Sequence, residues 1–181
     1  VLLPNTELDT GGGDWTLGGW FYLSSGMGGT DGLWGYDTAH TLYRASATTV
    51  KVYWGTTNMN PSTITQDTWN HIVVTRSGNT FSLYVNGGTP STGSDADTGD
   101  ATLYLGGQGS SSSKLLGSMN EISYFSTAIS LAQVQELFNN GVPFDLENNT
   151  LTGSPTLAGY WRNNVLHTDG KWKDLSTNSN H

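Results

Sequence analysis

The chain of 181 residues has no cysteine, which excludes disulfide bonds, cysteine nucleophiles and thiolate metal sites. Charged residues are also few, at 12%, and acidic ones dominate: 15 Asp and Glu against 7 Lys and Arg give a formal charge of -8. An acidic protein repels phosphate backbones, so we expect no nucleic-acid partner. Because the sequence has no basic cluster and no apolar run of transmembrane length, we expect no membrane insertion.

Glycine and aromatic residues, by contrast, are plentiful. There are 24 glycines and seven tryptophans, and aromatic residues reach 11%, although apolar residues make up only 35%. This composition is typical of short strands, many turns and a core filled by large rings. The length suits one domain, so we predict a single domain over residues 1–181. Since the chain does not begin with Met, we also expect it to be a fragment of a longer protein.

Residues 69–87 contain the clearest structural signal of the sequence. Two β-type runs flank Gly78-Asn79, which is typical of a two-residue hairpin loop. The period of two then predicts one apolar face, formed by Ile72, Val74, Phe81, Leu83 and Val85. The opposite face is mixed and includes His71, for which we expect a packed core position. One apolar face and one partly solvent-exposed face indicate an antiparallel sheet in a sandwich.

Other strand-like runs follow the same spacing, and one helix is signalled. The runs cover residues 15–23, 32–36, 41–46, 50–54, 101–106 and 115–125, with a further strand at 157–162. Ser130 and Gln133 form a capping box, and an apolar stripe follows it up to Gly141 and Pro143. We expect this short helix to cap an end of the sandwich.

The sequence order of four segments resembles the laminin-G-like domains of the concanavalin A-like superfamily. The matching segments are residues 15–23, 69–87, 103–107 and 117–130. The resemblance implies an all-β fold, a concanavalin A-like jelly-roll sandwich of two antiparallel sheets with one short capping helix. Such folds host lectins, adhesion modules and glycosidases alike, so function has to be argued from the site.

The tail, residues 153–181, leaves two alternatives open. Residues 172–181 resemble the turn that usually opens such domains, yet here they close the chain. The tail either supplies a strand that completes this domain or opens a second copy. We favour completion, since Tyr160 and Trp161 would otherwise be exposed. The helix and tail together are also locally similar to structural proteins of tailed phages.

A glycosidase on this fold needs two carboxylates that flank the glycosidic bond. The related laminarinase-type enzymes place Glu-x-Asp-x-x-Glu on one strand. The corresponding stretch here, residues 120–126, has only Glu121, with no Asp two residues later and no Glu five residues later. We therefore predict that the protein is not an enzyme and that Glu121 is a structural hydrogen-bonding residue.

An aromatic platform for sugar rings is the first candidate site. Trp34, Tyr36, Tyr53 and Trp54 crowd into neighbouring strand pairs, and Asp37 and Asn58 could fix sugar hydroxyls. The alternative is that these rings fill the core. Because Tyr53 and Trp54 point to opposite faces, we expect one of them to point outward.

A calcium site is the second candidate. Asp95, Asp97 and Asp100 lie on one loop, and hard oxygen ligands on a flexible loop suit Ca²⁺. Several laminin-G-like domains bind Ca²⁺ at a rim of the sandwich. The resemblance therefore implies that this loop could hold such a site. The alternative is an ordinary solvated turn.

These observations favour a non-enzymatic adhesion or carbohydrate-binding module of a larger surface or virion structural protein. Its partner would be a glycan or host-surface receptor, and its location the virion surface or the extracellular space. The alternative is a purely structural capsid-decoration, fibre or tail domain that contacts neighbouring virion subunits.

Overall fold

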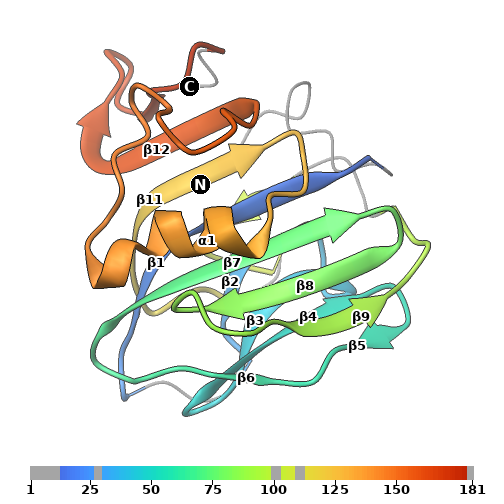
Figure 1. Ribbon diagram of the computed structural model, residues 1–181. Coiled ribbons are helices and arrows are strands. Elements are labelled where there is room, and N and C mark those ends of the chain that lie inside the picture. The colour runs from blue at the N-terminus through green and yellow to red at the C-terminus, as the bar shows by residue number, and fades with distance from the viewer. Residues whose placement is uncertain (1–12, 27–29, 99–102, 109–112, 179–181) are drawn as a thin grey trace.

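Two antiparallel sheets packed face to face form the protein in the computed structural model, which describes residues 13–26, 30–98, 103–108 and 113–178 (Figure 1). The first sheet has seven strands in the spatial order β13 (Trp172–Asp174), β12 (Leu157–Leu166), β11 (Gly117–Phe125), β1 (Trp15–Leu23), β7 (Trp69–Ser77), β8 (Thr80–Val85) and β9 (Ser91–Ser94). The second has the order β10 (Tyr104–Leu105), β2 (Gly32–Gly35), β3 (His40–Ser46), β4 (Thr49–Trp54) and β5 (Thr57–Asn58), with β6 (Ser62–Thr63) paired to β4. The predicted jelly-roll class is confirmed.

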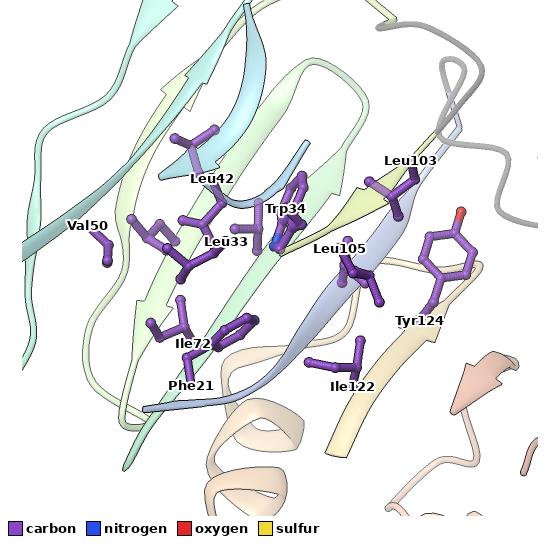
Figure 2. Close-up of a cluster of buried hydrophobic side chains, with 14 of the residues drawn as sticks. Phe21, Leu33, Trp34, Leu42, Val50, Ile72, Leu103, Leu105, Ile122 and Tyr124 are labelled. Atoms are coloured by element: carbon purple, nitrogen blue, oxygen red, sulfur yellow. The ribbon is translucent and has the colours of Figure 1, made fainter. Parts of the chain in front are cut away.

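The core lies between the two sheets and is built around large rings (Figure 2). Trp15 at the start of β1 contacts Trp34, Trp54 and Phe81, with ring centroids 5.6 to 6.1 Å apart. All four side chains are at most 1% exposed. Edge and tilted ring contacts of this kind add to the free energy gained from burial alone. This end of the sandwich is therefore held by aromatic packing.

The predicted hairpin is confirmed in register. Strands β7 and β8 pair Ser77 with Thr80 and Ile72 with Val85. The predicted apolar face is in the core, apart from the partly buried Val85. The opposite face is more buried than expected, because the side chains on it are at most 7% exposed. These are His71, Val73, Thr75 and Tyr84.

Helix α1 (Leu131–Phe138) explains why that face is buried. Ser130 forms the predicted capping box with Gln133. The helix does not cap an end of the sandwich, as the sequence led us to expect; it lies across the outer face of the seven-stranded sheet (Figure 1). There Val134 and Leu137 join Val73 and Tyr84 in a second apolar cluster. The 3₁₀ turn η1 (Asn139–Gly141) follows, and no helix in the described ranges is long and apolar enough to cross a membrane.

The tail packs into the seven-stranded sheet, the arrangement that the first of the two alternatives requires. Strand β12 pairs with β11, and β13 pairs with β12. Tyr160 and Trp161 are completely buried. Asp174 accepts a hydrogen bond from the Tyr160 backbone N–H at 2.8 Å, and Asn178 donates to the Ala158 carbonyl at 3.1 Å.

Several short strands were not predicted. Strands β5, β6 and β9 occupy stretches that read as polar loops, and β10 covers only two of the six residues expected at 101–106, of which 101 and 102 lie outside the described part. Two-residue strands of Ser, Thr and Asn carry no periodic pattern, so only their pairing partners define them.

Candidate functional site

The strand ends of β2, β3, β4 and β9 form a rim around His40. The side chain of His40 is 11% exposed and lies between two carboxylates. Its Nδ1 is 3.0 Å from Oδ1 of Asp37, and its Nε2 is 3.3 Å from Oδ2 of Asp97. These two Asp residues were predicted for different sites, a sugar site and a calcium site, and the fold brings them together. We call Asp37, His40 and Asp97 the rim cluster.

Local turns position the rim cluster. Oδ1 of Asp37 accepts hydrogen bonds from the backbone N–H groups of Ala39 and His40 at 2.7 and 2.8 Å. A short acidic side chain that bonds to the backbone two and three residues on is a common way to close a turn. On the other side, the Trp54 indole N–H donates to the Asp97 carbonyl at 2.8 Å. The loop after β9 is thereby tied to the end of β4.

The two rim carboxylates are accessible to solvent. Their side chains are 48% and 49% exposed for Asp37 and Asp97. The imidazole lies between two acceptor groups, of which its Nδ1 contacts Asp37, and both carboxylates stay in contact with water. Such a pair can accept hydrogen bonds from the hydroxyl groups of a ligand.

Asp95 is occupied by donors from the protein itself. Its Oδ2 accepts from the backbone N–H of Thr56 at 2.9 Å and of Thr57 at 3.1 Å, and its Oδ1 accepts from the backbone N–H of Asp97 at 2.9 Å. These hydrogen bonds, led by those from the backbone of Asp97 and Thr56, lower the pKa of Asp95 to about 2. Oxygens surrounded by N–H groups are poorly placed to coordinate a cation.

Calcium binding stays a prediction. Among the described residues, no group of three or more His, Cys, Asp or Glu side chains is arranged to hold a metal ion. Asp100 lies outside the described residues, and the orientation of Asp95 does not suit Ca²⁺. Asp97 is the predicted ligand that keeps an exposed carboxylate.

A buried arginine lies beneath this loop. Arg76 is 1% exposed, donates from Nε to the Gly78 carbonyl at 2.9 Å, and its guanidinium carbon is 5.1 Å from the centroid of the Phe81 ring. Burial lowers the pKa of Arg76, and the charges of Asp95 and Asp97 oppose that shift. The carboxylates of the loop thus stabilise the charged form of the buried guanidinium.

Three of the four predicted platform rings are core residues. Trp34, Tyr36 and Trp54 are 1%, 5% and 0% exposed, so none presents a ring face to a ligand. The platform hypothesis is wrong for these three, because the inward period of β2 and β4 places them against Trp15 and its neighbours. The alternative that the rings fill the core is correct for them.

Tyr53 points outward, as the alternation with Trp54 led us to expect, and is partly exposed. It lies in a row that crosses the outer face of the second sheet through paired positions, namely Tyr104, Gly35, Thr41, Tyr53 and Asn58. The middle of the row is buried and closely packed, since Thr41 is 1% exposed and a Cβ at Gly35 would lie 2.8 Å from Cβ of Thr41. We call this row the outer tyrosine row.

Tyr43 lies next to this row. It pairs with Lys51, two positions along β3 from Thr41, and is also partly exposed. Burial raises the pKa of Tyr43, and the neighbouring Tyr53 adds to the increase. The two phenols therefore lie near each other on a face that α1, on the other sheet, does not cover. His40 directly precedes Thr41, so the rim cluster borders this face.

Glu121 is structural, as predicted. It is 7% exposed and accepts hydrogen bonds from the Tyr160 hydroxyl and from Arg162 Nε, the latter at 3.1 Å. Its φ of +53° coincides with a register shift between β1 and β11. These hydrogen bonds tie β11 to β12 through the Glu121 side chain.

Two functional features were missed from the sequence. His40 could have been linked to Asp37 through their spacing of three residues, since such a spacing allows a turn with a side-chain contact. Trp69 is 43% exposed and forms an edge contact of 5.9 Å with Tyr22. No local pattern separates an exposed tryptophan from a buried one, so the sequence offered no signal for it.

Comparisons with known proteins agree with this architecture. A laminin-G-type family model of the concanavalin A-like lectin/glucanases superfamily matches residues 1–135. A search of curated proteins found no match.

Solved structures share the fold at low sequence identity. A candidate carbohydrate binding protein from Bacteroides ovatus superposes with a TM-score of 0.70 at 16% identity, over 93% of this chain and 50% of that one. Trypanosoma rangeli sialidase has a TM-score of 0.58 at 18% identity, over 71% of this chain and 23% of the sialidase. Domain 4 of the extracellular arabinanase AbnA from Geobacillus stearothermophilus, in complex with arabinotriose, has a TM-score of 0.55 at 17% identity, over 68% of this chain and 66% of that one. The chain thus spans about half of the Bacteroides protein and about a quarter of the sialidase.

Proposed function

The chain belongs to the concanavalin A-like lectin/glucanase superfamily, and from this premise we propose that it is a non-enzymatic carbohydrate-binding module of a larger protein. The observation that carries the proposal is the position of the rim cluster, whose two half-exposed carboxylates border a sheet face with outward tyrosines. Sugar sites combine these two features, because a ring face stacks on an aromatic side chain while fixed polar groups bind the hydroxyls.

Each part of the surface has a role in this proposal. Tyr53 offers a ring for stacking, and Asn58 beside it offers both donors and acceptors. Asp37 and Asp97 accept hydrogen bonds from sugar hydroxyls. His40 is a positioning residue, since its Nδ1 contacts the Asp37 carboxylate at 3.0 Å.

The charge of the site favours neutral glycans. The rim presents two carboxylates, and the whole chain carries a formal charge of -8. Acidic sugars would be repelled in the absence of a bridging cation. Calcium bound through Asp97 and Asp100 would reverse this preference, so the effect of a chelator belongs in the test.

A binding role fits the carboxylates better than catalysis. Glu121, which the glycosidase hypothesis requires, is buried and hydrogen-bonded to Tyr160 and Arg162. The Bacteroides protein, by its name, and the arabinanase domain, by its arabinotriose complex, support carbohydrate binding on this fold. In the same proposal the module is displayed on a virion or extracellular surface, and its partner is a glycan or a host-surface receptor.

The test is a glycan array with neutral and acidic oligosaccharides, run in calcium and again in a chelator. We expect binding of neutral glycans by the native protein, and a loss of at least roughly tenfold in affinity for Tyr53→Ala and for Asp97→Asn. Asp169→Asn is the matched control, because Asp169 is an exposed carboxylate on the 167–171 turn, away from the rim.

Three results would change the proposal. Absence of binding in both conditions overturns it and leaves a structural role, with contacts to neighbouring subunits, as the alternative. Release of shorter sugars from the array glycans overturns the non-enzymatic part. Binding that disappears in chelator assigns calcium to the site.

A further inference from the structure

A pocket lies where the seven-stranded sheet meets the loop after β10. It has a volume of about 340 Å³ and is lined by Leu105, Gly106, Leu115, Gly117, Ser118, Met119, Asn163 and Trp172. Strand β1 runs from the rim to one wall of this pocket. Trp15 at the start of β1 contacts Trp54 of the rim, whereas Tyr22 near its end pairs with Ser118 of the pocket. Seven residues of extended chain span roughly 24 Å, so the wall formed by Ser118 lies away from the rim, whereas Leu105 pairs with Trp34 and lies nearer to it.

The lining of this pocket is uncharged. None of its eight lining residues in the described part of the chain is acidic or basic. An ionic ligand would therefore lose its hydration without gaining a partner of opposite charge, which is strongly unfavourable. The pocket suits a neutral ligand and differs in this respect from the acidic rim.

Apolar and polar groups are segregated within the pocket. Trp172 is partly buried against the core, and Leu105, Leu115 and Met119 continue the apolar surface. Asn163 and Ser118 are exposed and supply an amide and a hydroxyl. A ligand with one apolar face and a rim of uncharged hydroxyls matches this arrangement, which is the chemistry of a pyranose ring.

A pair of aromatic residues lies on the opposite, outer face of the same sheet. Ser118 pairs with Tyr22, which pairs with Trp69, so the three residues occupy neighbouring strands β11, β1 and β7. Trp69 is 43% exposed and lies 5.9 Å from Tyr22 between ring centroids. Two strand spacings place it roughly 10 Å from Ser118. Alternation along β1 and β7 points Tyr22 and Trp69 to the outer face with Trp20 and His71, whereas Trp172 packs on the core side, so these two rings do not continue the pocket.

We propose that this pocket is a second glycan subsite, which takes an uncharged pyranose ring against Trp172. The inference rests on the proposed carbohydrate-binding function, but it does not depend on the rim cluster. Two subsites on one module would raise the avidity for a long neutral polysaccharide without any further contact.

The test compares variants of the two sites with the same probes, the neutral trisaccharides cellotriose, maltotriose and arabinotriose and the acidic sialyllactose. Ser118→Phe fills the pocket from an exposed position, and Asn163→Ala removes its amide. Both spare the core contacts of Trp172. Ser126→Phe, at an exposed position just beyond the other end of β11, is the matched control. Binding is measured by calorimetry, and folding by the melting temperature.

We expect Ser118→Phe and Asn163→Ala to weaken binding of at least one neutral trisaccharide by roughly tenfold. Ser126→Phe and Asp97→Asn should leave the affinity for that trisaccharide unchanged. Loss of binding in Asp97→Asn, with both pocket variants unaffected, overturns the second subsite and leaves the proposed function in place. Loss in the pocket variants supports the subsite, and the rim is removed from the mechanism only if Tyr53→Ala and Asp97→Asn bind every glycan of the array as tightly as the native protein does. Absence of any trisaccharide binding overturns both.

Discussion

Buried His71 makes a quantitative prediction about stability and pH. The side chain is 4% exposed and packs against the rings of Trp20 and Phe138, with centroids 5.2 and 6.2 Å away. Its Nδ1 has no hydrogen-bond partner in the structure. Burial lowers the pKa of His71 to about 3 from an ordinary value of 6.5. In the folded protein the imidazole is therefore neutral throughout the physiological range.

The sign follows from proton binding. As pH falls below 6.5, the unfolded chain takes up a proton at His71 while the folded chain does not, so acidification favours unfolding until the folded pKa of about 3 is reached. One pKa unit corresponds to about 1.4 kcal/mol. At pH 4.5 the two-unit gap to the unfolded value predicts a loss of about 3 kcal/mol relative to pH 7.5. The contribution is fully recovered above the unfolded pKa.

Urea denaturation at pH 7.5, 6.0 and 4.5 measures this loss. We expect His71→Phe, which keeps an aromatic ring between Trp20 and Phe138, to remove most of the decline. His167→Gln is the control, because His167 is a partly exposed histidine whose replacement should leave the decline intact. Carboxylates with lowered pKa values, such as Asp95, are ionised in both states at pH 4.5 and add little. Equal declines in the native protein and in His71→Phe would refute the reasoning.

Two further predictions concern buried and rim hydrogen bonds. Tyr160→Phe removes a donor from the buried Glu121 carboxylate and should lower the unfolding free energy by about 1–3 kcal/mol, measured by urea denaturation at pH 7.5; an unchanged midpoint would contradict this role. Asp95→Asn should lower the melting temperature at pH 7. The difference should shrink as pH falls from 3.8 toward 2, because Asp95 has a lowered pKa and loses its contribution when protonated. A difference that persists at pH 2 would show that the charge of Asp95 is irrelevant to the turn.

Patterns confined to a few neighbouring residues were predictable. The Gly78-Asn79 loop sets the register of β7 and β8, since a two-residue loop and a period of two leave one pairing that buries the apolar face. Ser130 and Gln133 satisfy each other across one helical turn, so the start of α1 is also local. Both signals depend on backbone geometry and require no knowledge of the rest of the chain.

The candidate site could be predicted only in part, because burial depends on what covers a residue. Alternation along β4 predicted that Tyr53 and Trp54 point to opposite faces, yet only the packing of Trp15 against Trp54 decided which one is inside. Asp37 and Asp97 are 60 positions apart in sequence, and the meeting of β3 with the loop after β9 brings them to the same histidine. Asp95 and Asp97 looked equivalent in the sequence. In the structure the Asp95 carboxylate accepts hydrogen bonds from backbone N–H groups, whereas the Asp97 side chain is exposed.

By itself the sequence determined the fold class, the absence of thiol chemistry, the acidic charge, the hairpin register and the helix start, because composition and short-range periodicity carry these properties. Only the tertiary structure decided which aromatic rings are core, which carboxylates are exposed to solvent, and that the uncharged pocket beside Trp172 extends to the other end of β1. The physical reason is that exposure, hydrogen-bond saturation and pocket shape result from contacts between residues distant in sequence, and those contacts exist only once the two sheets have packed.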